Sequence, residues 1–245
     1  MKKLLTIAIA SIAVAAAAGT YSPSIGVTSI SLSQKNNVIP VQFNSLATSG
    51  NVTAGELVCT NNIPLTSHLY VYDSANGYTA WELQESGWVG LNVASTKADD
   101  ITYSGNASNK VLSAGSAIWL SFPAAQDPAI NVSFYGKVAT STNTTIAAGT
   151  ESAPVSTLVC NPTGAVISSA DLKTKLAEFR AAKDKIIPLN AEFGGYYSYS
   201  AKDSIWKKVT GATASETEEL PNIPVNGGFW YVRAKGNTTD GSIIW

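Results

Sequence analysis

Short runs rich in Val, Ile, Thr, Tyr and Trp alternate with clusters of Gly, Asn, Asp and Pro along most of the chain. Such runs are typical of β-strands, and the clusters are typical of the turns between them. The pattern predicts strands at 27–32, 38–43, 68–72, 78–83, 117–122, 130–138, 229–234 and 242–245. Asn76-Gly77 and Asp240-Gly241 favour hairpins, because these residue types adopt the backbone angles of tight turns. We therefore expect a mainly β protein.

One segment has helical rather than strand periodicity. Its apolar positions are Leu172, Leu176, Phe179 and Ile186. Ser168 occupies an N-cap position with Asp171 three residues later, which is a helix-start signal. Pro188 would end the helix. The sequence predicts one helix over 169–186.

The two halves of the chain resemble each other in three places. The matched segments are Leu57-Val58-Cys59 with Leu158-Val159-Cys160, Tyr70-Val-Tyr72 and Trp81 with Tyr197-Ser-Tyr199 and Trp206, and 112–119 with 223–230. The last match pairs Trp119 with Trp230. The predicted fold is two similar antiparallel β-sandwich or barrel-like domains from an internal duplication, with the helix inserted in the second. The expected domains are 19–138 and 153–245, joined by a Ser/Thr/Asn-rich linker at 139–152.

The N-terminus predicts export. Lys2 and Lys3 precede an apolar stretch at 4–14, and alanines at 15–18 follow it. This order is typical of a secretory signal peptide, here residues 1–18, and we expect no transmembrane helix after its removal. The expected location is extracellular or at the cell surface, with the periplasm as the alternative.

Some of these segments resemble a known group of proteins. A strand beginning Gly26-Val-Thr-Ser-Ile-Ser-Leu is followed by an Asn-Val-Ile-Pro-Val strand, and a Gly-x-x-x-Trp anchor ends at Trp119. Together with the export signal, these features resemble uncharacterised secreted β-rich proteins of Verrucomicrobia and Lentisphaerae-type bacteria. The resemblance covers most of the chain after residue 18. It implies a β fold and export, and it implies no activity.

Composition excludes several classes of function. Charged residues make up 13% of the 245 residues, about half the usual share, and 16 Lys+Arg against 17 Asp+Glu give a net charge of −1. This balance provides no basic surface for nucleic acid. His68 is the only histidine, and with two cysteines it supplies too few ligands for a zinc site. We expect no metal, no cofactor and no nucleic-acid partner.

Catalytic signatures are also weak, and we expect a non-enzyme with no catalytic residue. His68 lies within a predicted strand and the chain has no Gly-x-Ser-x-Gly motif. The nearest carboxylate pairs for a glycosidase are Glu82 with Glu85 and Asp99 with Asp100. Neighbouring carboxylates of this kind are usually solvated surface residues.

The two cysteines allow two interpretations. In an oxidising compartment Cys59 and Cys160 would form a disulfide, which we predict. Alternatively, both are buried as small apolar side chains of their own domains.

Aromatic residues are the candidate ligand-binding groups. The expected contact residues are Tyr196, Tyr197, Tyr199, Trp206, Tyr70 and Tyr72. The alternative is that the aromatic residues fill the cores, especially Trp81, Trp119, Trp206 and Trp230.

Three functional classes follow from these observations. The first is a non-catalytic cell-surface or extracellular structural or interaction protein that assembles with itself or other surface proteins. The second is a carbohydrate-binding module, which requires exposed aromatic residues and would have glycans as partners. The third, a secreted hydrolase, requires a cleft with His68 or two opposed carboxylates.

Overall fold

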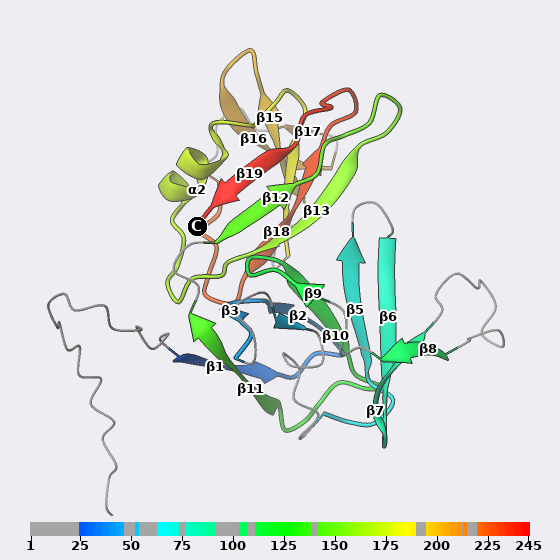
Figure 1. Ribbon diagram of the computed structural model, residues 1–245. Coiled ribbons are helices and arrows are strands. Elements are labelled where there is room, and N and C mark those ends of the chain that lie inside the picture. The colour runs from blue at the N-terminus through cyan, green and yellow to red at the C-terminus, as the bar shows by residue number, and fades with distance from the viewer. Residues whose placement is uncertain are drawn as a thin grey trace, which may run out of the picture.

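The computed structural model describes residues 25–46, 52–53, 63–73, 77–91, 103–106, 111–138, 142–189, 195–211, 213–214 and 220–245. The predicted signal peptide, 1–18, lies outside these residues. In the described residues the chain forms several antiparallel sheets and one short helix, which confirms a mainly β fold. The sheets form two units that are consecutive in sequence and lie one above the other in Figure 1.

The first unit contains the strands up to residue 138. They are β1 (Ile25–Leu32), β2 (Asn36–Pro40), β3 (Phe43–Asn44), β4 (Val52–Thr53), β5 (His68–Asp73), β6 (Gly77–Gln84), β7 (Gly87–Leu91), β8 (Tyr103–Asn106), β9 (Val111–Leu112), β10 (Ala117–Ser121) and β11 (Ile130–Val138). The second unit follows. Its elements are β12 (Asn143–Ile146), β13 (Val155–Cys160), α2 (Ser169–Leu176), β14 (Lys185–Pro188), β15 (Tyr196–Ser200), β16 (Ile205–Thr210), β17 (Thr213–Ala214), β18 (Gly228–Arg233) and β19 (Gly241–Ile244).

The two units share one strand order. The large sheet of the first unit runs β2-β10-β5-β6-β7-β8, and that of the second runs β13-β18-β14-β15-β16-β17. In both, the last strand of the sheet in sequence lies between its first and second strands. In both, a strand before this sheet pairs antiparallel with a strand after it, β1 with β11 and β12 with β19. Descent of both units from one duplicated ancestor remains a prediction.

The third predicted sequence match agrees with this shared order residue by residue. Trp119 lies opposite Val38 of β2, and Trp230 lies opposite Leu158 of β13. The residues four positions before these tryptophans, Gly115 and Asn226, both have positive φ angles, of 88° and 63°. The turns that precede β10 and β18 are therefore equivalent.

The other two predicted matches do not follow this shared order, and the segment at 57–59 lies outside the described residues. Cys160 lies opposite Gly228, and the equivalent position in the first unit is Pro40, opposite Ala117, rather than Cys59. Similarly, β5 is equivalent to β14 rather than to β15. The Tyr-x-Tyr motif lies on the third strand of the first large sheet and on the fourth strand of the second, so its two copies misled the alignment.

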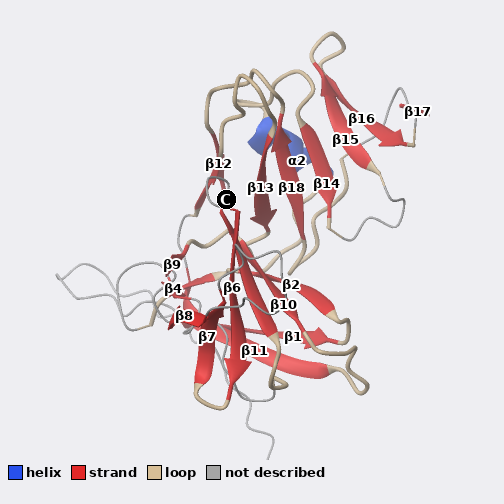
Figure 2. Cartoon of the chain, turned by 90° about the vertical axis from the view of Figure 1, so that its right-hand side faces the viewer, coloured by secondary structure: helices blue, strands red, loops and turns tan. Residues whose placement is uncertain are grey.

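Each unit has its own apolar core between its sheets. In the first unit, Phe134 of β11 and Leu69 of β5 are among the fully buried side chains between the two sheets. In the second unit, α2 and the β12–β19 pair cover the large sheet, and Leu172, Leu176 and Ile243 are completely buried there. Figure 2 shows the helix behind the strands of the second large sheet.

The helix is shorter than its sequence pattern predicted. Ser168 caps it as expected, accepting a hydrogen bond from the Asp171 amide at 3.1 Å, but the helix ends at Leu176. Further along, Lys183 has a φ of 70°, which an α-helix does not tolerate. The chain turns there, and the Ala181 amide donates a hydrogen bond to the Asp184 carboxylate at 3.0 Å. Ile186, predicted in the helix, lies on β14.

The predicted linker and the predicted C-terminal hairpin both differ from expectation. Residues 143–146, within the linker at 139–152, form β12 and belong to the second unit. The C-terminal strand β19 pairs with β12 across about 100 residues of sequence, not with β18 through the Asp240-Gly241 turn. The Asp240 carboxylate instead accepts from the Ala148 amide at 2.7 Å.

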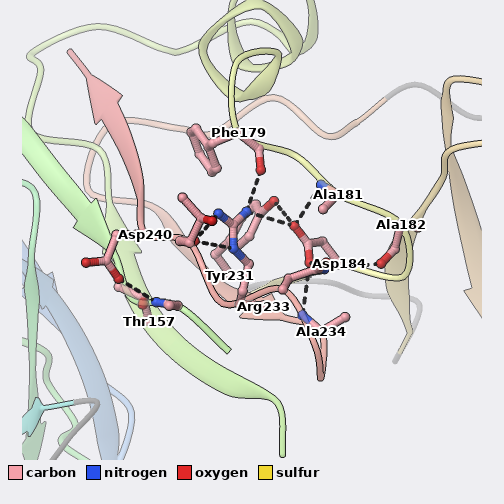
Figure 3. A network of polar contacts seen from close by, with 12 residues as sticks. Thr157, Phe179, Ala181, Ala182, Asp184, Tyr231, Arg233, Ala234 and Asp240 are labelled. Atoms are coloured by element: carbon pink, nitrogen blue, oxygen red, sulfur yellow. Dashed lines mark hydrogen bonds and ion pairs between the residues drawn. The ribbon is translucent and has the colours of Figure 1, made fainter. Parts of the chain in front are cut away.

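The second unit contains a buried ion pair between Arg233 and Asp184 (Figure 3). Arg233 Nη1 lies 3.1 Å from Asp184 Oδ2, and both side chains are at most 3% exposed. The same carboxylate accepts hydrogen bonds from the Tyr231 hydroxyl at 2.7 Å and from the Ala234 amide at 2.9 Å. Burial and the Asp184 charge raise the pKa of Tyr231 far above its usual range. In the first unit the equivalent positions of Asp184 and Arg233 hold Ser67 and Phe122, which are also buried.

The two units share a small apolar cluster where they meet. Its buried members are Ala117, Leu158 and Cys160, and Val38, Trp119, Leu189 and Trp230 pack against them. Several of these are equivalent residues of the two units, such as Trp119 with Trp230 and Val38 with Leu158. The Cys160 amide also donates to the Gly115 carbonyl at 3.0 Å, which joins the two units through their backbones.

The predicted Cys59–Cys160 disulfide is not present in the structure. Cys160 has a free, fully buried thiol, and burial raises its pKa well above the ordinary range. Its sulfur packs within the cluster between the units, whereas the alternative interpretation placed each cysteine within its own domain. Cys59 lies outside the described residues.

Candidate functional site

One face of the first large sheet is turned away from the core of its unit. On β5, Leu69 and Val71 point into the core, so His68, Tyr70 and Tyr72 occupy the opposite face. Their neighbours across the sheet follow from the register: Ser121 and Glu82 flank His68, and Trp119 and Ala80 flank Tyr70. We call this side of the sheet the outer face.

A pocket of about 390 Å³ lies on the outer face. We call it the aromatic pocket, and its lining residues are Asn36, Tyr70, Tyr78, Trp119, Leu120 and Ser121. They come from β2, β5, β6 and β10, which are neighbouring strands of one sheet. The pocket therefore rests on a hydrogen-bonded framework rather than on loops.

Aromatic rings form its walls at steep angles to one another. Tyr70 and Tyr78 have ring centroids 6.4 Å apart and planes at 87°. Tyr72 lies beside Tyr78 at 5.1 Å and also contacts Trp230 of the second unit at 4.9 Å and 88°. The second unit therefore contacts the aromatic cluster of the pocket through Trp230.

A line of polar side chains continues from Tyr70. The Tyr70 hydroxyl lies 3.1 Å from His68 Nδ1, and His68 Nε2 lies 3.2 Å from Glu82 Oε2. Because an ionised carboxylate only accepts hydrogen bonds, Nε2 must carry a hydrogen. In a neutral imidazole Nδ1 is then an acceptor, so the Tyr70 hydroxyl donates to it. The lone pairs of the Tyr70 oxygen are left for a ligand.

Both pocket tyrosines are neutral phenols at physiological pH. Burial raises the pKa of Tyr70, and burial together with the nearby Tyr72 raises the pKa of Tyr78. Neither is therefore activated as a phenolate nucleophile. Ser121 lies opposite His68, but its hydroxyl donates to Asn36 Oδ1 at 2.8 Å. These groups present hydrogen-bonding atoms and ring faces, which suit binding.

The predicted ligand-binding residues do not lie together. Tyr70 lines the aromatic pocket and Tyr72 supports its wall. Tyr197 and Trp206, in contrast, are 5% and 3% exposed in the core of the second unit. Tyr199 packs against Trp206 at a centroid distance of 5.3 Å. Tyr196 is on the outer face of the second large sheet with Lys185 Nζ 4.5 Å from its ring centroid. An exposed platform from 196 to 206 is not formed.

Sequence reasoning missed Tyr78 and Trp119 as pocket residues and placed Trp119 in the core. The alternation along β10 contained the necessary signal: Ile118 and Leu120 are apolar and buried, so Trp119 and Ser121 belong to the other face. Of the tryptophans predicted as core, Trp81 and Trp206 are buried. Trp230, like Trp119, packs against the cluster between the units.

The second unit has different residues at the positions equivalent to Tyr70, Ser121 and His68. Tyr70 corresponds to Ile187, which lies opposite Trp230 as Tyr70 lies opposite Trp119. By the same register Ser121 corresponds to Val232 and His68 to Lys185. Trp119 has an equivalent in Trp230, but both sheets have the same strand order without sharing Tyr70, Ser121 and His68, so these three residues are not required by the fold.

Comparison of the chain with family models, curated proteins and solved structures found no match. Within the described ranges, no three His, Cys, Asp or Glu residues are grouped so that they could hold a metal ion. A helix of the length and apolar character needed to cross a membrane does not occur in that part of the chain.

Proposed function

We propose that this protein is a non-catalytic, exported binding protein that holds a sugar residue of a glycan in the aromatic pocket. The observation that carries the proposal is the difference between two sheets of the same strand order. Only the first has Tyr70, Ser121 and His68 where the second has Ile187, Val232 and Lys185. A difference that the fold does not require is best explained by a ligand.

The chemistry of the pocket suits a sugar ring. A pyranose has apolar C–H faces, which pack on aromatic rings, and a rim of hydroxyl groups. Ligand sites typically combine apolar walls with a few fixed polar groups, and about 390 Å³ lies toward the small end of their range. Trp119 and Tyr78 provide ring surface, while Asn36 and Ser121 provide hydrogen-bonding atoms.

The row of polar side chains formed by Tyr70, His68 and Glu82 fixes the direction of one hydrogen bond to the ligand. With a neutral His68, the Tyr70 hydroxyl uses its hydrogen in the bond to His68, so its oxygen accepts from the ligand. A sugar hydroxyl can donate this bond, whereas an ether or carbonyl oxygen cannot. The Glu82 carboxylate holds the imidazole in the required tautomer. Glu82 and His68 are therefore positioning residues for Tyr70 in this proposal.

Replacing Trp119 with alanine is expected to weaken glycan binding at least tenfold, because it removes one aromatic wall. Binding is measured by calorimetry against neutral oligosaccharides selected on a glycan array with the unmodified protein. Tyr135→Ala is the matched control, since Tyr135 is an exposed aromatic residue of the same unit on another sheet. Its affinity should be unchanged.

The proposal is wrong if the unmodified protein binds no glycan on the array, or if Trp119→Ala and Tyr135→Ala retain equal affinity. Circular dichroism spectra of both variants establish that they are folded. Hydrolysis of a bound oligosaccharide, lost in His68→Asn, would instead favour the hydrolase class.

A further inference from the structure

Strand β1 forms an open edge of the first unit. It pairs with β11 along its whole length, from Ile25 opposite Lys137 to Leu32 opposite Ile130, and lies at the end of the order β1-β11-β3. Its other side therefore presents unpaired backbone groups among the described residues. Such an edge is a template for another strand.

This edge lacks the features that usually prevent pairing. Its eight residues, Ile-Gly-Val-Thr-Ser-Ile-Ser-Leu, include no charge and no proline, and its register with β11 has no bulge. Protected edges are commonly short, charged, bulged or interrupted by proline. On the face turned to solvent, Ile25 and Val27 are 66% and 69% exposed.

The equivalent strand of the second unit shows that the fold does not need these properties. Strand β12 has four residues, and its outward side chains are the polar Asn143 and Thr145. Both strands pair with the strand that follows their large sheet. The length and apolar outward surface of β1 are therefore particular to the first unit.

We propose that β1 pairs antiparallel with β1 of a second copy of this chain, so that the two three-stranded sheets become one continuous sheet. The uncharged sequence needs no complementary charges from another kind of protein. Antiparallel pairing of two identical strands closes a two-fold symmetric dimer.

The outward side chains select the register centred on Val27. In this register Val27 faces Val27 of the second copy, Ile25 faces Ser29, and all outward residues stay on one face. Tyr135, 53% exposed, lies opposite Val27 on β11. The pairing thus aligns a row of four apolar side chains across the dimer, Tyr135 and Val27 from each copy. The aromatic pocket is on the other sheet of the unit and stays open.

The first test is the mass in solution of the exported chain, measured by sedimentation equilibrium with Val27→Lys and Thr145→Lys as matched variants. The unmodified chain and Thr145→Lys should dimerise, while Val27→Lys should dimerise at least tenfold more weakly because two like charges would face each other. Circular dichroism establishes that Val27→Lys is folded. A monomeric unmodified chain, or a Val27→Lys dimer of unchanged strength, would overturn the proposal.

Cysteine cross-linking tests the register. Directly opposite residues of paired strands have Cα atoms about 4.5–5.5 Å apart, within the range of a disulfide. Val27→Cys should form a disulfide between the introduced thiols of the two copies, detected by peptide mass spectrometry. Ser31→Cys should form no such bond, because Ser31 does not face its own copy in this register. Equal cross-linking of both variants, or cross-linking of Ser31→Cys alone, would contradict the pairing centred on Val27.

Discussion

Replacing Arg233 with methionine is expected to lower the free energy of unfolding by about 3–5 kcal/mol, because it leaves the Asp184 carboxylate buried without its ion-pair partner. Arg233 also donates to the Thr239 and Phe179 carbonyls, which would lose a partner. Urea unfolding followed by tryptophan fluorescence measures the change. Lys207→Met is the control, since the Lys207–Asp203 pair is partly exposed at the surface and its loss should change stability little.

The first unit suggests how to restore the lost stability. Its equivalent positions are occupied by Ser67 and Phe122, so the double variant Asp184→Ser/Arg233→Phe replaces a buried ion pair with the residues that the same strand order already accepts. The double variant should be more stable than Arg233→Met, because no charge remains buried. A double variant less stable than the single one would show that the residues at these equivalent positions cannot be exchanged between the two units.

Gly115→Ala is expected to destabilise the protein more than any alanine replacement at an open turn glycine. Gly115 has a φ of 88°, where a non-glycine residue costs about 1–3 kcal/mol. A Cβ there would also clash with Thr144 Oγ1 and lie 2.9 Å from Trp245 Nε1, two atoms that are hydrogen-bonded to each other. These residues belong to the second unit, so the change would force the units apart.

Gly87→Ala separates the two contributions. Gly87 has a φ of 107°, but a Cβ would meet nothing within 4 Å. This variant should therefore have the backbone cost alone, and the difference between the two variants measures the crowding between the units. Equal unfolding free energies in urea for the two variants would show that Gly115 does not hold a tight contact there.

The sequence predicted strands at β5, β6, β10 and β11, but it did not predict β7 and β16, which have five and six residues. It missed β12, because four residues in a Ser/Thr/Asn-rich stretch carry too little apolar signal. The helix was predicted too long, since Ile186 fits a helical period although the helix ends at Leu176 and the chain turns at Lys183 before β14. Its start at Ser168 depends on local contacts and was predicted correctly.

The site was harder to predict than the strands. Alternation shows that Trp119 and Leu120 lie on different faces, but it does not show which face another unit covers. The pairing of β10 between β2 and β5 depends on contacts far apart in sequence, and it is this order that brings Tyr70, Trp119 and Ser121 together. The C-terminal strand illustrates the same limit, because its partner lies about 100 residues away rather than across the nearest turn.

The rate at which the buried thiol of Cys160 is alkylated can measure how often the two units separate. The thiol lies in the cluster that both units form, and burial makes it unreactive by blocking access and by raising its pKa, which disfavours the thiolate. Alkylation of the Cys160 peptide, followed by mass spectrometry, should therefore proceed only through opening of this junction or unfolding of the second unit. Labelling that is much faster than global unfolding would show that the two units separate and reassociate while each stays folded.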